Sequence, residues 1–168
     1  MKKAAFRLVI LFFLNSINSA FAQIPTLTLM GIDDSRHSLT EFIGRDKWVV
    51  VNIWGPKCPP CIDEMPELQN FHDDHKDRDA IVLGIALDFP SFGPANKQDV
   101  VKFVDDYFIS FPVLLGDAMS ISHLGGGRLQ GTPTTLLFNP RGTLEAIQVG
   151  TVTQAGIEKF IRKIKSRK

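Results

Sequence analysis

Two cysteines carry the most distinctive chemistry in this chain. Cys58 and Cys61 are separated by two residues and are the only cysteines among 168 residues. They stand between an apolar run, Trp48 to Trp54, and a stretch with apolar residues at helical spacing, so we expect the pair where a buried strand ends and a helix begins. There the helix dipole favours a Cys58 thiolate, exposed enough to attack another disulfide, and Cys61 can resolve the mixed disulfide. The pattern predicts dithiol–disulfide exchange.

Two other interpretations of the cysteine pair stay open behind the redox one. A purely structural bridge across this four-residue loop contributes only about 2 kcal/mol to stability in the chain-entropy model. A metal centre needs more ligands than one C-x-x-C supplies, and the sequence has no second pair. The histidines show no metal-ligand spacing and are expected at the surface; they are His37, His72, His75 and His123. We therefore expect no metal site and no cofactor beyond a redox-active Cys58–Cys61 disulfide.

The composition is that of an ordinary globular protein. Hydrophobic residues make up 44% of the chain and charged residues 22%, which excludes disordered, collagen-like and coiled-coil classes. The formal net charge is +1, and this balance gives no reason to expect a nucleic-acid partner.

The N-terminus has the three parts of a secretory signal peptide. Three basic residues lie among the first seven, residues 8–14 are wholly apolar, and Ala20 and Ala22 supply small residues before a cleavage point. The apolar run is shorter than the roughly 20 residues that span a bilayer. We expect residues 1–22 to be cleaved and residues 23–168 to form a single domain in the periplasm or another extracytoplasmic compartment. An uncleaved anchor is the alternative.

The rest of the chain alternates between strand-like and helix-like segments. Near-continuous apolar and β-branched residues at Trp48 to Trp54 predict a central strand covered on both faces. The helix that follows the cysteines is expected over 59–75, with a kink at Pro66. The other expected elements are a hairpin that begins at 26–30, strands over 80–87, 112–115, 134–138 and 143–149, a helical turn at 118–124, and helices over 98–108 and 154–165. Helices between and after strands indicate an α/β fold.

Three motifs resemble the thioredoxin superfamily. They are the run Trp54 to Cys61, the proline Pro66 five residues later, and Gly131-Thr132-Pro133-Thr134-Thr135 before a late hairpin. The resemblance implies an α/β thioredoxin fold, in which a central mixed β-sheet is flanked by helices. It also implies an N-terminal β-hairpin and an insertion between the second and third core strands, for which residues 88–111 are the candidate.

Within this superfamily, the chain is similar to the exported TlpA/ResA-like thiol-disulfide oxidoreductases. The stretches that carry this similarity are 50–54, 58–68 and 111–115. It covers about residues 26–165, nearly the whole chain that remains after signal cleavage.

The resemblance implies roles for residues around the cysteines. In this superfamily the proline at the position of Pro133 follows a cis peptide bond and faces the cysteine pair, and the residue before it offers its backbone to an extended client peptide. Taken alone, Pro133 would be an ordinary proline at a strand entry. The Thr132 hydroxyl could also reach a cysteine sulfur, with β-propensity as the other reason for a threonine here. Trp54, Thr132 and Pro133 are the candidate substrate-binding residues.

A polar residue, Asn52, interrupts the central strand, and its amide must find hydrogen-bond partners if the strand is buried. Many thioredoxins have a buried aspartate at the matching position, where it manages the proton of the second cysteine, but asparagine does not titrate. Glu64 lies three residues after Cys61 on the same helical face, and the resemblance implies that a glutamate at this spacing modulates the thiols. Cys58, Cys61 and Glu64 are the candidate catalytic residues; a solvated helix glutamate is the alternative for Glu64.

The resemblance implies an exported thiol-disulfide oxidoreductase, and we expect it to work mainly as a reductant. Lys57 could favour a Cys58 thiolate by its charge, whereas Pro59 and Pro60 remove two N–H donors from the helix start, so we expect no strongly oxidising disulfide. The implied partners are client proteins with a disulfide, in cytochrome c maturation or copper-site assembly, and a membrane thiol transporter as electron donor. The alternatives are a disulfide oxidase or isomerase, and a non-catalytic copper-handling module.

Overall fold

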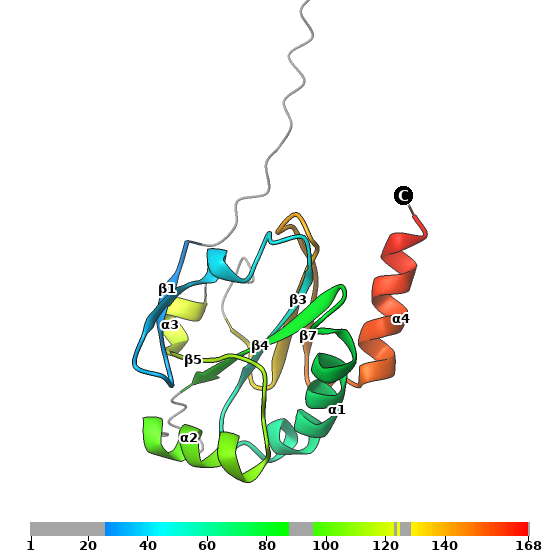
Figure 1. Ribbon diagram of the computed structural model, residues 1–168. Coiled ribbons are helices and arrows are strands. Elements are labelled where there is room, and N and C mark those ends of the chain that lie inside the picture. Colours follow the sequence, from blue (N-terminus) through cyan, green and yellow to red (C-terminus); the bar gives the residue numbers. More distant parts are fainter. Residues whose placement is uncertain (1–25, 88–95, 123, 125–128, 168) are drawn as a thin grey trace, which may run out of the picture.

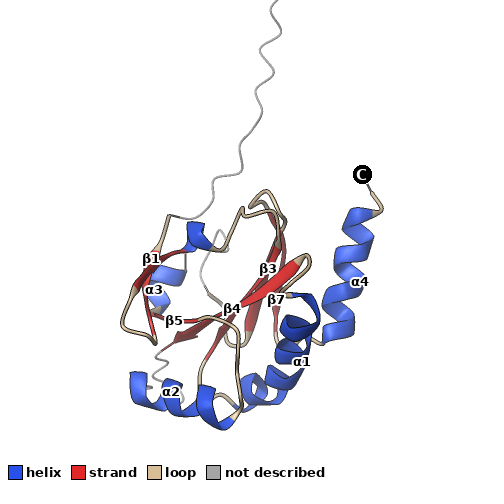
Figure 2. Cartoon of the chain, viewed as in Figure 1, coloured by secondary structure: helices blue, strands red, loops and turns tan. Residues whose placement is uncertain are grey.

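The computed structural model describes residues 26–87, 96–122, 124 and 129–167. The expected signal segment 1–22 and His123 lie outside these residues. Figures 1 and 2 show a sheet with helices on both faces. The strands are β1 (Thr28–Gly31), β2 (Arg36–Ser38), β3 (Trp48–Trp54), β4 (Ala80–Leu87), β5 (Val113–Gly116), β6 (Thr134–Phe138) and β7 (Leu144–Val149). The helices are α1 (Pro59–His75), α2 (Lys97–Asp106), α3 (Ala118–Ile121) and α4 (Gln154–Lys165), with a 3-10 helix η1 (Leu39–Glu41).

The strands form one mixed sheet in the order β2-β1-β5-β4-β3-β6-β7. β4 pairs in parallel with β3 and with β5, and the other neighbouring pairs are antiparallel. The hairpin β1–β2 adds to the sheet through β5. The mixed sheet, the flanking helices and the N-terminal hairpin are confirmed.

Strand β3 lies at the centre of the fold, and all seven of its residues are buried. Its alternate residues Trp48, Val50 and Trp54 face a core built with α1, α2 and α4. Val49, Val51 and Ile53 face the opposite core, built with η1 and α3. Apolar residues on both faces therefore make β3 a central strand, as expected, and any polar residue within it must be satisfied inside the protein.

Helix α1 begins one residue after Cys58 and carries prolines at its first two positions, Pro59 and Pro60. Proline fits there because the first helical N–H groups have no partner within the helix. The buried face of α1 includes Met65, Leu68 and Phe71, while Pro66 lies inside the helix on its exposed side. Since α1 follows β3 after only four residues, both cysteines are placed at the end of the central strand.

Helix α2 lies between β4 and β5, within the segment expected to be the insertion. It ends two residues earlier than expected because Phe108 has φ of +52°, a left-handed conformation that does not continue a helix. Within the described ranges, no helix is both long and apolar enough to cross a membrane.

Candidate active site

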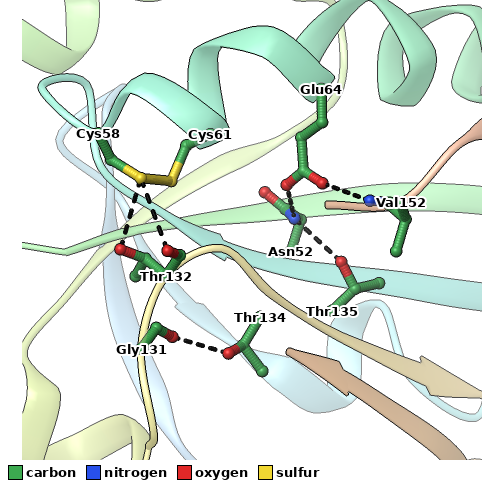
Figure 3. Close-up of a disulfide and its surroundings, with 9 residues drawn as sticks. All are labelled: Asn52, Cys58, Cys61, Glu64, Gly131, Thr132, Thr134, Thr135 and Val152. Atoms are coloured by element: carbon green, nitrogen blue, oxygen red, sulfur yellow. Dashed lines mark hydrogen bonds between the residues drawn. A yellow bond between two sulfur atoms is a disulfide. The ribbon is translucent and has the colours of Figure 1, made fainter. Parts of the chain in front are cut away.

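Cys58 and Cys61 form a disulfide at the start of α1 (Figure 3). Cys58 is the residue that precedes the first helical turn, and Cys61 lies within that turn. This is the position expected for a nucleophile at the helix N-terminus with a resolving cysteine behind it.

The expected exposure of Cys58 is wrong for this oxidised state. Only 1% of Cys58 and none of Cys61 is exposed. Thr132 lies directly against Cys58 Sγ: its hydroxyl donates to the sulfur at 3.6 Å, and its carbonyl oxygen is 3.8 Å from the same atom (Figure 3). A loop 74 residues away in sequence thus packs on the sulfur.

The loop that carries Thr132 contains a cis peptide bond between Thr132 and Pro133, as the resemblance implies. Two hydrogen bonds hold its shape. Thr134 Oγ1 donates to the Gly131 carbonyl at 2.7 Å, and the Gly150 N–H donates to the Pro133 carbonyl at 2.9 Å. The loop therefore joins the cysteines to the β6–β7 end of the sheet.

Glu64 is buried, with 2% of the residue exposed, so the solvated-glutamate alternative is wrong. Its Oε1 accepts a hydrogen bond of 2.8 Å from Asn52 Nδ2, and its Oε2 accepts one of 2.8 Å from the Val152 N–H (Figure 3). Burial raises the pKa of Glu64 above its usual range, and the bonds from Val152 and Asn52 oppose that rise. A carboxyl group with a raised pKa thus lies one helical turn after Cys61.

The amide nitrogen of Asn52 finds the partners that its buried position requires. Besides Glu64, Nδ2 donates to Thr135 Oγ1 at 3.1 Å. Asn52 Oδ1 has no hydrogen-bond partner among the residues that the structure describes. Thr135 was not expected as a partner of Asn52, because this contact depends on the pairing of the two residues between β3 and β6.

Trp54 does not fit its assignment as a substrate-binding residue in this conformation. Its side chain is fully buried, and its ring packs on Phe103 of α2 with the ring centres 4.8 Å apart. A protein client cannot touch a ring that α2 covers. Trp54 instead belongs to the hydrophobic core, where it packs against α2.

An acidic residue that the sequence did not indicate pairs with the lysine that precedes Cys58. Lys57 Nζ is 3.0 Å from Asp99 Oδ2, on the first turn of α2. The hydrogen bond from Lys57 lowers the pKa of Asp99. The positive charge that precedes Cys58 is therefore offset by a negative charge from the insertion.

One expectation about the histidines is wrong. His72 is buried rather than at the surface; its Nδ1 accepts a hydrogen bond of 3.1 Å from the Val82 N–H, and burial lowers its pKa. In the part of the chain that the structure describes, no group of three or more histidine, cysteine or carboxylate side chains is placed to hold a metal ion.

Comparisons with known proteins show the family of this chain. A sequence model of the AhpC/TSA family matches residues 21–147. The chain is 28% identical to thiol-disulfide oxidoreductase ResA of Halalkalibacterium halodurans over 150 residues, which are 89% of this chain and 80% of that protein. It is 32% identical to the thioredoxin-like protein YneN of Bacillus subtilis, covering 81% of this chain and 75% of YneN. The solved structure of a DsbF homologue from Corynebacterium diphtheriae superposes with a TM-score of 0.71 and 28% identity, covering 83% of this chain and 85% of that one. The chain belongs to the AhpC/TSA family of the thioredoxin superfamily and is a thiol-disulfide oxidoreductase of the ResA-like type.

Proposed function

We propose that the protein works outside the cytoplasm as a reductant of disulfides in client proteins. The observation that favours reduction over oxidation of clients is that few groups at the start of α1 stabilise a Cys58 thiolate. Pro59 and Pro60 supply no N–H donors there, and the Lys57 charge is offset by Asp99 at 3.0 Å. Strongly oxidising disulfides owe their potential to a stabilised reduced form, so weak thiolate support favours a low potential.

The proposed reaction is a two-step exchange. The Cys58 thiolate attacks one sulfur of the client disulfide, and the other client sulfur leaves and takes up a proton. Cys61 then loses its proton and attacks Cys58 Sγ, which restores the Cys58–Cys61 disulfide and releases the second client thiol. The client gains two electrons and two protons, and a dithiol donor, proposed to be a membrane thiol transporter, returns them to the protein.

Glu64 is proposed to control the proton of Cys61. An ionised Glu64 disfavours a second negative charge nearby and so keeps Cys61 as a thiol. Its raised pKa suits a group that takes up a proton more readily than a surface glutamate does, at the step where Cys61 must become the attacking thiolate.

Thr132 and Pro133 are proposed to receive the client backbone. The Thr132 carbonyl and hydroxyl both lie against Cys58 Sγ, so a peptide that docks there is brought to the nucleophile. Because the sulfur is covered in the oxidised state, this loop must shift for the attack to occur.

The proposed clients are cysteine pairs of proteins in cytochrome c maturation or copper-site assembly. Support comes from the signal-like pattern at residues 1–22 and from the ResA-like relatives. A Cys61→Ala variant leaves the mixed disulfide unresolved, so clients trapped on Cys58 in cells can be identified by mass spectrometry.

The N-terminus of the protein isolated from cells tests export. A mature N-terminus at Gln23 would support export with cleavage; an intact Met1 in the membrane fraction would indicate an anchor.

The reduction potential of the Cys58–Cys61 pair distinguishes a reductant of client disulfides from an oxidase. We expect a value nearer the roughly −270 mV of thioredoxin than the roughly −120 mV of a strong periplasmic oxidant. Equilibration with glutathione or dithiothreitol measures it. A value above about −150 mV would overturn the reductant and favour the oxidase alternative.

A further inference from the structure

A buried hydrogen-bond acceptor lies unused beside the redox pair. Asn52 is fully buried, and its Nδ2 makes two hydrogen bonds, but within the described residues its Oδ1 makes none. An unpaired buried acceptor destabilises the folded protein, because it has given up its hydrogen bonds to water. Such groups are uncommon in native proteins, and a redox role is one of the reasons for keeping them.

Glu64 determines which way the Asn52 amide points. An ionised carboxylate can only accept hydrogen bonds, so the amide nitrogen must face Glu64 Oε1, at 2.8 Å. The amide oxygen then points elsewhere, and Figure 3 shows it on the side of Asn52 toward the disulfide. Cys61 lies on the same face of α1 as Glu64, one turn nearer the helix start, and is completely buried.

Reduction of the disulfide creates a donor in this place. It breaks the S–S bond, takes up two electrons and two protons from the donor dithiol, and leaves an S–H group on Cys61. Since Cys61 is 0% exposed, water cannot supply an acceptor for that group without a change of structure. A buried donor thus arises on the side of Asn52 toward which its oxygen, unpartnered within the described residues, points.

We propose that the Cys61 thiol of the reduced protein donates a hydrogen bond to Asn52 Oδ1. Asn52 is then a positioning residue that orients the resolving cysteine and holds it in the thiol form. The proposal rests on the redox cycle of Cys58 and Cys61, and it is independent of the client and of the direction of electron flow.

This bond stabilises the dithiol relative to the disulfide. Without it, the equilibrium with glutathione moves toward the disulfide by about tenfold, which is about 30 mV for a two-electron couple. A tenfold shift adjusts the potential of a reductant without reversing its direction.

A second buried donor belongs to Trp54, two residues after Asn52 on the same face of β3. Trp54 Nε1 also has no partner in the described part of the chain. Gly84 of β4 is the residue that pairs with Asn52. Trp54 Nε1 lies 3.1 Å from the point where a Cβ atom on Gly84 would stand. The experiment must therefore observe the Cys61 S–H group itself.

Infrared spectroscopy of the S–H stretch makes that observation. The Cys58→Ser variant leaves Cys61 as the only thiol of the protein, so its S–H band is unambiguous. We expect a band shifted to lower frequency relative to a small thiol in an apolar solvent. In this background Asn52→Leu should move the band to the free position. Thr135→Val is the matched control, since it removes the other Asn52 partner in the strands and leaves Oδ1 in place, and it should keep the shifted band.

The redox equilibrium supplies a second measurement on the protein with both cysteines. Asn52→Leu should favour the disulfide by about tenfold, and Thr135→Val by less than about twofold. A free S–H band in Cys58→Ser alone overturns the proposal, even if Asn52→Leu does not fold. An unchanged band in Asn52→Leu overturns it as well. A high potential of the wild type would contradict the reductant function while leaving the S–H result intact.

Discussion

Glu64 on α1 and Asn52 on β3 form a hydrogen bond of 2.8 Å between two buried side chains. The other carboxylate oxygen of Glu64 accepts from the Val152 N–H, just before α4. One ionisable group therefore joins the catalytic helix, the central strand and the segment that leads into the last helix. It does so one turn away from the resolving cysteine, where its protonation state can affect the thiol.

Replacing Glu64 by glutamine should slow resolution and change its pH dependence. Burial raises the pKa of Glu64, so wild-type reactivity should respond to pH in a range above that of a surface glutamate, and the variant should lack this response. Stopped-flow reduction of a model disulfide from about pH 5 to 9, around the ordinary cysteine value, compares the two proteins. Glu67→Gln is the matched control, because Glu67 lies on the same helix and accepts from the Gln154 N–H at 2.8 Å. Superimposable profiles for Glu64→Gln and wild type would leave Glu64 a purely structural role.

Cys58 should be alkylated before Cys61 in the reduced protein. Cys58 precedes α1 and a loop, that of Thr132, packs on its sulfur, whereas Cys61 lies within the first turn of the helix. Mass mapping after brief iodoacetamide treatment gives the order. Modification of Cys61 first would reverse the nucleophile and resolver assignments.

The Thr132 hydroxyl should assist the Cys58 thiolate. Thr132→Val removes the donor that lies 3.6 Å from Cys58 Sγ without changing the size of the side chain, so the thiolate fraction and the alkylation rate at pH 7 should fall by up to about tenfold. Thr134→Val removes a hydroxyl from the same loop that bonds to the Gly131 carbonyl instead. If both variants slow alkylation equally, the effect comes from loop distortion rather than from the contact with sulfur.

Elements with a local signal could be predicted from the sequence. The bounds of β3 and α1 follow from a continuous apolar run, then prolines that suit the first turn of a helix, then apolar residues at helical spacing. Strand β6 is likewise bounded by Pro133 and by the turn after Phe138. Each of these depends on residues close together in the chain.

The contacts within the site depend on residues far apart in the chain. Glu64 is buried because Asn52 and Val152, 12 and 88 residues away, supply its donors. Cys58 is covered because the Thr132 loop packs on it, and Trp54 is enclosed by Phe103 of the inserted helix. Spacing along one helix places Glu64 near Cys61 but does not show what lies opposite.

Asp99 should limit the thiolate fraction of Cys58 through Lys57. Asp99→Asn removes the negative charge that lies 3.0 Å from Lys57 Nζ, so Cys58 should be alkylated faster, by about two- to threefold at low ionic strength and by less at high salt. The same change in a Lys57→Met background should have no effect, since no charge remains to be offset. An equal acceleration in both backgrounds would mean that Asp99 acts through the position of α2.

Asp79 should contribute to stability in a pH-dependent way. Hydrogen bonds from His75 at 2.9 Å and from Lys165 at 2.7 Å lower the pKa of Asp79 to about 2 and connect the end of α1 with α4. A depressed pKa means that the contribution is present above the ordinary aspartate value of 3.8 and is lost as the pH falls toward 2. Asp79→Asn should lower the free energy of unfolding by roughly 1 kcal/mol at pH 7, because the groups are partly exposed and solvent screens them. Urea denaturation from pH 7 to about pH 2 should show this difference shrinking as Asp79 is protonated. Asp77→Asn removes the same charge two residues away, and a difference as large in that variant would assign the effect to net charge rather than to the contacts of Asp79.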